Sequence, residues 1–260
     1  MFFDTHCHLN SDEFLTDIDG HLRRAHEAGV KRMNVIGWDY PSSLKAVTLA
    51  QTYPNIYAAV GFHPCNIQQV PEDEYARART LMSEDKVVAI GEIGLDYYWE
   101  KDPAAREKQK RYFIRQINEA NKLKKPVIIH SRDAIQDTYD ILKENRPLYG
   151  GVMHCYSGPA EMVMMFIELG LFISLGGPVT FKNGRVPKDV AKIVPLKWLL
   201  IETDSPYLAP HPYRGKQNEV SFLPLVAQEI ALIKNLDVED IAEWTSNNAE
   251  RLFHVKHYDY

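Results

Sequence analysis

Acid and imidazole side chains end several short apolar runs in this sequence. The run F-F-D-T-H-C-H-L at 2–9 carries two histidines, and the run W-L-L-I-E-T-D at 198–204 ends in an aspartate. Imidazole nitrogens and carboxylate oxygens bind divalent metals, and a set of this size suits a pair of metal ions that activates water. The side chains that we predict as metal ligands are His6, His8, Glu92, His130, His154 and Asp204.

The spacing of these side chains suits one shared site at the ends of strands. Side chains alternate between the two faces of a strand, so residues two apart point the same way. We therefore expect His6 and His8 to point inward together and Cys7 to point out toward a helix layer. A buried polar group is costly unless something satisfies it, and a pair of divalent cations would satisfy the whole set. The same parity pairs His130 with Arg132, Glu202 with Asp204, and Glu92 with Asp96.

Each of these signals is weak when it is taken alone. A single H-x-H is common, a lone histidine at the end of an apolar run is more often a hydrogen-bonded core residue, and Glu92 could simply lie near Arg132. The joint pattern is more specific, because an H-x-H, two single histidines and an aspartate all end inferred strands in chain order. We therefore favour a metal site over a packed core.

Eight short β-rich runs recur along the chain, with helix-length segments between most of them. Alternating β and α units of this length predict a parallel sheet covered by helices. The predicted strands lie near 2–9, 32–38, 56–63, 87–93, 126–131, 149–155, 171–176 and 198–203. The predicted helices lie at 12–29, 42–52, 104–124, 133–145, 159–169, 221–235 and 238–253.

Eight such strands in 260 residues favour closure into a single (β/α)8 barrel of the TIM type, for which about 250 residues is typical. The fold class is then α/β, and the active site lies at the C-terminal ends of the strands, where the candidate ligands stand. An open doubly wound sheet is the alternative. It is less favoured because no G-x-G-x-x-G follows the first predicted strand.

Composition places the chain in a broad class. No stretch approaches the roughly 18 to 20 apolar residues that a membrane span requires, and the first residues M-F-F-D-T-H show no basic segment followed by an apolar one. The three cysteines, Cys7, Cys65 and Cys155, lie far apart and cannot all pair with one another. We expect a cytoplasmic protein that forms one metal-dependent hydrolase barrel domain over 1–260 and has no membrane partner.

The net charge of −5 argues against a broad positive surface for nucleic acid. Tight, sequence-specific binding of a duplex is therefore not expected. The metal site itself is different, because two dications, two carboxylates and four neutral imidazoles sum to a charge of +2. Such a site attracts an anionic substrate such as a phosphodiester and lowers the pKa of bound water toward neutrality.

Blocks of sequence that run nearly from end to end match one known family. They are D-T-H-C-H-L at 4–9, G-F-H-P at 61–64, I-G-E-I-G-L-D-Y at 90–97, P-V-I-I-H-S-R at 126–132, H-C-Y-S-G at 154–158, I-E-T-D-S-P-Y-L-A-P at 201–210, R-G-K-Q-N-E at 214–219 and N-A-E-R-L-F at 248–253. The chain resembles the TatD-type metal-dependent deoxyribonucleases of the amidohydrolase-like superfamily. One departure is Val220, where the family pattern has a proline.

The resemblance implies a TIM-type barrel, two divalent metal ions and hydrolysis of phosphodiester bonds in DNA. It implies that one metal is held by His6, His8, Glu92 and Asp204, and the other by His130, His154 and the same Glu92 as a bridge. The ligand set leaves the metal open, because imidazoles suit Zn and Ni whereas carboxylates and open positions also admit Mn or Mg.

We predict Asp204, Glu92 and His63 as catalytic residues, with Asp204 orienting the attacking water and accepting its proton. His63 is either a group that contacts substrate or protonates the leaving group, or a residue that anchors a loop. Arg132 suits a bidentate grip on phosphate, and its alternative is an ion pair to Glu202 or Asp96. Arg214 and Lys216 are further predicted substrate contacts, although a solvated loop is the default for both.

Aromatic residues gather after two predicted strands, where they could stack on unpaired bases. For each ring the alternative is that it packs a loop onto the barrel rim. These residues are Trp38, Tyr40, Tyr97, Tyr98 and Trp99.

The predicted partner is DNA, as single strands or ends, cut by an exonuclease that acts as a monomer without an obligate protein partner. One alternative keeps the barrel and the metals but cleaves an amide, ester or lactone, as a deacylase of aminoacyl-tRNA would. A second alternative is a non-enzymatic protein on an inherited scaffold. The intact ligand set argues against it, because a relic site is expected to lose ligands.

Overall fold

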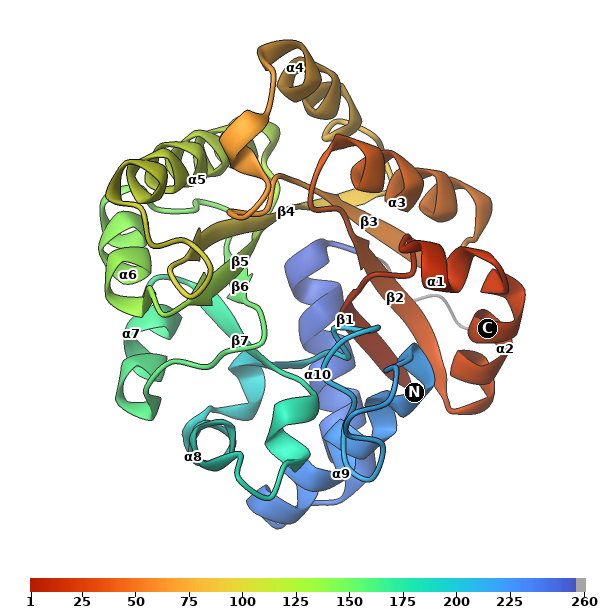
Figure 1. Cartoon of the computed structure of the whole chain (residues 1–260). Coiled ribbons are helices and arrows are strands. Elements are labelled where there is room, and N and C mark those ends of the chain that lie inside the picture. Colours follow the sequence, from red (N-terminus) through yellow and green to blue (C-terminus); the bar gives the residue numbers. More distant parts are fainter. Residues whose placement is uncertain (256–260) are drawn as a thin grey trace.

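A single parallel sheet of eight strands forms the centre of the computed structural model, which describes residues 1–255 (Figure 1). The strands follow one another in chain order, and a parallel ladder joins each to the next. The predicted (β/α)8 barrel is confirmed. The strands are β1 (Phe2–Cys7), β2 (Val30–Ile36), β3 (Ile56–Val60), β4 (Val87–Asp96), β5 (Val127–Arg132), β6 (Gly151–Met153), β7 (Leu171–Leu175) and β8 (Leu199–Ile201).

Helices surround the sheet on its outer side (Figure 1). The predicted helix at 12–29 is two helices, and α4 and α8 fall where no helix was predicted. α4 buries only Tyr75 and Ala78 and so offers a weak apolar pattern. The helices are α1 (Asp12–Leu15), α2 (Ile18–Glu27), α3 (Tyr40–Thr52), α4 (Glu72–Leu81), α5 (Pro103–Leu123), α6 (Ile135–Glu144), α7 (Val163–Glu168), α8 (Arg185–Ile193), α9 (Leu223–Lys234) and α10 (Val238–Phe253).

Two apolar clusters hold the barrel together. The outer cluster lies between the sheet and the helices, and the inner cluster fills the barrel near the start of the strands. The inner cluster includes Leu252 and Phe253 of α10, which therefore packs across the N-terminal end of the barrel. The strand residues of the inner cluster are Phe3, Ile36, Tyr57, Ala59, Val88, Ala89, Ile128, Val152, Phe172 and Leu200. The opposite end is left for polar side chains.

A register shift in β1 determines where the first histidines point. Asp4 pairs with Met33 and Cys7 with Val35, so three steps along β1 match two steps along β2. Such a bulge inverts the alternation of faces, and bulges are common beside active sites for this reason. Phe3 lies in the inner cluster before the bulge, and Cys7 lies in the outer cluster after it. His6 and His8 therefore point into the barrel.

The barrel closes between β1 and β8 at the same place. Within residues 1–255 no ladder pairs these two strands, but the backbone connects them just beyond β8. The Asp204 amide donates to the His6 carbonyl at 2.9 Å, and the His8 amide donates to the Ser205 carbonyl at 2.8 Å. These two bonds bring Asp204 beside both histidines.

Gly94 is a position where the barrel admits no side chain. It pairs with His130 across the β4–β5 ladder at φ +143°, and a Cβ there would lie 2.0 Å from the His130 carbonyl oxygen. Gly94→Ala is expected to reduce the free energy of unfolding by at least about 3 kcal/mol, measured by denaturant titration. Gly170→Ala is the matched control, because Gly170 has φ +85° but no atom within 4 Å of the added methyl group. An equal loss in both variants would contradict the steric explanation.

None of the helices described, from α1 to α10, has the length and apolar character needed to cross a membrane. The last five residues of the predicted domain 1–260 lie outside the described residues, and the single-domain assignment stays a prediction.

Candidate metal centre

Glu92 lies at the centre of the predicted ligand set, and its two carboxylate oxygens face different histidines. Oε2 lies 3.5 Å from His6 Nε2 and 4.0 Å from His8 Nε2. Oε1 lies 2.9 Å from His130 Nδ1 and 3.2 Å from His154 Nε2. One buried carboxylate is therefore shared between two pairs of imidazoles.

Asp204 completes the first of these groups. Its Oδ1 lies 3.3 Å from His8 Nε2 and 3.7 Å from His6 Nε2. Its side chain is 13% exposed, so it is not fully enclosed. The structure thus brings all six predicted ligands together, although β6 and β8 end before His154 and Asp204.

The arrangement fits divalent metal ions. Ring nitrogens and carboxylate oxygens converge within 4.8 Å of one another in the group His6, His8 and Glu92, and again in the group His63, Glu92 and His130. These are the nitrogen and oxygen donors that Zn and related ions take. Buried His6 Nδ1 also has no hydrogen-bond partner among the described residues. A cation would account for so many acceptors that meet in a buried space.

The electrostatics of the centre favour an ionised Glu92. Burial raises the pKa of this carboxyl, but the charge of His154 and the hydrogen bonds from His130 and His154 outweigh burial and hold the pKa well below its usual value. Burial lowers the pKa of His154, yet Glu202 and Glu92 bring the pKa well above its usual value. Metal ligands must be deprotonated, so metal binding is expected to release protons from this cluster.

Two further carboxylates contact the ring nitrogens of His130 and His154 that face away from Glu92. Asp96 Oδ2 lies 3.0 Å from His130 Nε2, and Glu202 Oε1 lies 2.8 Å from His154 Nδ1. Such outer partners set the orientation and basicity of a ligating imidazole. The alternation of side chains along the strands predicted that Asp96 and Glu202 face inward. It did not indicate that they contact the histidines.

Glu202→Gln is expected to weaken metal binding about 10-fold, because the amide is a poorer partner for His154 than a carboxylate is. Competition with a chromophoric chelator measures the apparent affinity. Glu168→Gln is the control, since Glu168 is exposed on α7. A Glu202→Gln protein with unchanged affinity would show that this contact is only structural.

Asp4 was missed as a functional residue by the sequence prediction. Its Oδ1 accepts hydrogen bonds from the amides of His6 and Thr203 at 3.2 and 3.0 Å, and its Oδ2 accepts one from Thr203 Oγ1 at 2.6 Å. Burial raises the pKa of Asp4 to about 7. This carboxyl ties β1 to the segment after β8, and it thereby positions ligands from both ends of the chain. Only its place in the D-T-H-C-H motif could have suggested this role.

His63 lies beside the second group of ligands. Its Nε2 is 3.6 Å from Glu92 Oε1, and its Nδ1 accepts the Cys65 amide at 3.1 Å. Burial lowers the pKa of His63 to about 3, so the ring is neutral. His63, Cys65 and Asp96 also form a group with donor atoms within 4.8 Å. The oxygens of Asp96 are, however, already occupied by His130 and by backbone amides.

The three predicted substrate contacts lie in different surroundings. The Arg132 guanidinium lies 3.8 Å from the centroid of the Tyr98 ring, and within residues 1–255 it has no ion pair to Glu202 or Asp96. Arg214 donates to Asn183 Oδ1 at 2.9 Å and lies over Phe181, and Lys216 lies 5.9 Å from the centroid of the Tyr213 ring. No described contact joins Arg214 or Lys216 to the metal ligands.

The five aromatic residues predicted at the mouth divide into three kinds. Tyr40 and Tyr97 pack against the outer cluster, and the Tyr97 hydroxyl donates to Asp137. The Trp38 ring meets His8 edge to face at 5.2 Å. Tyr98 and Trp99 are exposed.

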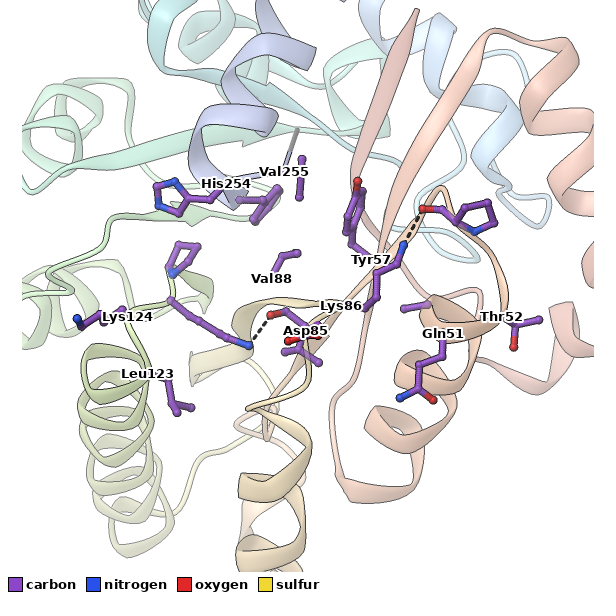
Figure 2. Close-up of a pocket in the computed structure, with 16 residues that line it drawn as sticks. Gln51, Thr52, Tyr57, Asp85, Lys86, Val88, Leu123, Lys124, His254 and Val255 are labelled. Atoms are coloured by element: carbon purple, nitrogen blue, oxygen red, sulfur yellow. Dashed lines mark hydrogen bonds between the residues drawn. The ribbon is translucent and has the colours of Figure 1, made fainter. Parts of the chain in front are cut away.

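A cavity of about 890 Å³ lies at the opposite end of the barrel and is not part of this centre. It is lined by the start of β3 and β4 and by the last residues of α3 and α5. Figure 2 shows that Lys86 makes one of the drawn hydrogen bonds, which it donates to the Pro54 carbonyl at 2.6 Å. Lys125 donates to the Val87 carbonyl at 2.5 Å. These ammonium groups hold loops together and are not free to bind an anion.

Comparison with known proteins identifies the family. The sequence profile described as TatD related DNase matches residues 3–254. An uncharacterized metal-dependent hydrolase YabD of Bacillus subtilis is 45% identical over 256 residues, which cover 98% of this chain and 100% of that protein. The uncharacterized metal-dependent hydrolase YcfH of Escherichia coli is 40% identical over 97% of this chain and 95% of its own length.

Solved structures of related proteins have the same fold as this chain. The crystal structure of YjjV, a TatD homolog from Escherichia coli, superposes with a TM-score of 0.93 at 31% identity and covers 98% of both chains. A TatD family hydrolase from Entamoeba histolytica has a TM-score of 0.86 over 96% of this chain and 97% of its own, at 24% identity, and so shows the shared fold alone. The chain therefore belongs to the TatD-related DNase family and is a metal-dependent hydrolase.

Proposed function

We propose that this hydrolase cleaves phosphodiester bonds in DNA and acts as an exonuclease on single-stranded or frayed ends. The observation that carries the proposal is the position of Glu92, whose two oxygens face two separate groups of histidines. That arrangement suits two metal ions bridged by one carboxylate, and paired metal sites are typical of nucleases and phosphatases. The family match supports the same chemistry.

The ligands divide between the two ions by distance. His6, His8, Asp204 and Glu92 Oε2 would hold one ion, and His130, His154 and Glu92 Oε1 would hold the other. When bound, Zn, Mn, Mg or Ni would lower the pKa of water and neutralise charge on the phosphate. The two ligand carboxylates leave a net charge of about +2 at such a site, which favours an anionic substrate over a neutral amide.

Asp204 takes up a proton in this proposal, and His63 supplies a hydrogen bond. Asp204 is partly exposed, so its carboxylate can orient the attacking water and accept its proton. His63 accepts the Cys65 amide on Nδ1, so its neutral ring carries the proton on Nε2 and faces the centre. From there this N–H can donate a hydrogen bond to a phosphate oxygen or to the leaving oxygen, and it keeps its proton because a neutral ring that lost it would become an imidazolate.

We also propose a cytoplasmic location and a monomer without an obligate protein partner. Cys7, Cys65 and Cys155 are all free thiols in the described chain, which suits a reducing compartment. Arg132, Arg214 and Lys216 remain proposed substrate contacts.

Hydrolysis of end-labelled single-stranded DNA tests the proposed function. Metal-stripped protein should be inactive, and added Mg, Mn or Zn should restore stepwise shortening of the strand, whose labelled end reveals the polarity. Protein that binds metal in stoichiometric amounts but cleaves no DNA with any of these ions would contradict the proposal. That outcome would favour a deacylase or another amidohydrolase activity.

A further inference from the structure

Three residues form an exposed surface beside the metal centre, which we call the rim platform: Tyr98, Trp99 and Arg132. Arg132 ends β5 two residues after the ligand His130, and it pairs with Asp96 across the β4–β5 ladder. Its guanidinium lies 3.8 Å from the Tyr98 ring centroid and 5.8 Å from the Trp99 ring centroid. Tyr98 is 44% exposed and Trp99 is 68% exposed. Both rings are therefore accessible next to a positive charge.

The hydrogen-bond donors of Arg132 are unused. Within the described chain its guanidinium has no carboxylate partner and no hydrogen bond, whereas Arg115 makes two bonds of 2.8 Å to Glu72. The Tyr98 ring holds the guanidinium without occupying its N–H groups. A planar guanidinium with free donors is suited to bidentate binding of phosphate.

One carboxylate connects the rim platform to the metal centre. Asp96 Oδ2 contacts the ligand His130 at 3.0 Å, and Asp96 Oδ1 accepts the amides of Tyr98 and Trp99 at 3.0 and 2.9 Å. The carbonyl of Tyr97 in the same loop accepts Lys101 Nζ at 2.6 Å. The loop that carries the rings is therefore anchored to the residue that orients a ligand, so the distance between platform and centre is well determined.

The position of Arg132 indicates which phosphate it binds. Two residues along a strand span about 6.6 Å, so the Arg132 backbone lies that far beyond His130, on the side of the mouth that carries Trp99. The guanidinium lies over the Tyr98 and Trp99 rings, and within residues 1–255 it contacts none of the candidate ligands, so the cation stands beside the metal centre instead of in it. A neighbouring phosphate in the same strand of nucleic acid would meet this charge.

We infer that the rim platform is a subsite for one unpaired nucleotide next to the scissile bond, with its base stacked on Trp99 and its phosphate bound by Arg132. This inference rests on the proposed function and names the substrate feature that the enzyme selects. A base in a duplex is covered on both faces by its neighbours and cannot stack on Trp99. An unpaired base can, and such stacking tolerates any sequence.

Steady-state kinetics with substrates that lack one feature at a time test the subsite. The substrates are single-stranded oligothymidylate, an abasic oligomer of the same length, and the dinucleoside monophosphate TpT, which has no neighbouring phosphate. Trp99→Ala should raise KM for oligothymidylate about 10-fold, with kcat within about twofold, and should leave KM for the abasic oligomer within about twofold. Trp99→Phe should restore most of the loss.

Arg132→Gln should raise KM about 10-fold for both oligomers but not for TpT.

Binding provides a second readout that does not depend on turnover. Oligothymidylate should quench the tryptophan fluorescence of the metal-loaded protein, and Trp99→Ala should remove most of the quench. Trp244→Ala is the matched control, because Trp244 is also exposed but lies on α10. Arg185→Gln serves the same purpose for Arg132, since Arg185 is an exposed arginine on α8.

The outcomes separate the subsite from the proposed function. Cleavage of TpT and of the abasic oligomer by the wild-type protein reports phosphodiesterase activity alone. If these two substrates are cleaved but the Trp99→Ala and Arg132→Gln proteins have the wild-type KM for oligothymidylate, the subsite is wrong and the proposed function stands. If no phosphodiester is cleaved and no oligomer quenches the fluorescence, both are wrong.

Discussion

Glu92→Gln is expected to reduce kcat/KM on single-stranded DNA by about 1,000-fold or more and to reduce the bound metal from two ions to at most one. Glu92 is the residue whose two oxygens face both groups of histidines. The amide has nearly the same shape, but it carries no charge and replaces one acceptor oxygen with an N–H donor. Metal content after dialysis, measured by plasma mass spectrometry, and the rate of DNA hydrolysis check the two parts of this prediction.

Glu168→Gln is the control for the loss of a carboxylate, because Glu168 is exposed on the outer helix α7. Circular dichroism and thermal unfolding should show that the Glu92→Gln protein is folded. A folded variant that retains two ions and wild-type activity would remove the basis of the proposed centre.

Asp204→Asn is expected to lower kcat by about 1,000-fold, since the amide cannot accept a proton from the attacking water. The variant should fold normally, because Asp204 has φ +56° and asparagine tolerates this left-handed conformation as well as aspartate does. A loss of activity would therefore report the chemistry of the carboxylate and not strain in the backbone. Rates on end-labelled DNA, together with thermal unfolding, provide the measurement.

Asp189→Asn is the matched control, because Asp189 is on α8 and, within residues 1–255, pairs only with Arg185 and Lys192 at the surface. The Asp204→Asn protein should also be assayed with saturating metal, which separates weaker binding of the ion from the loss of the proton acceptor. Full activity at saturating metal would show that Asp204 is a ligand without a role as a base.

The convergence of the candidate ligands was predictable from the sequence because each stands near the end of a strand. In a parallel barrel all strand ends meet at one face, so H-x-H, Glu92, His130, His154 and the E-T-D motif had to converge once eight strands were recognised. The spacing did not show how β1 turns its histidines toward that face. Simple alternation cannot place both Phe3 and His6 inside the barrel, and it is the bulge after Asp4 that reconciles them.

The supporting contacts could not be predicted from the sequence, because their partners come from distant parts of the chain. Asp4 bonds to Thr203, which is 199 residues away, and Asp96 bonds to His130, which is 34 residues away. Spacing carries information about one element at a time and not about which side chain of another strand lies opposite. For the same reason Arg132 had two open interpretations, and only the structure shows that it lies on Tyr98 without an ion pair among the described residues.

The most direct test of the central claim is the anomalous scattering of crystals grown with Mn or Zn. We predict two peaks that flank Glu92, one beside Oε2 with His6, His8 and Asp204, and one beside Oε1 with His130 and His154. A single peak at full occupancy, or a peak held by His63, Cys65 and Asp96 in place of one of these two, would contradict the shared-carboxylate centre.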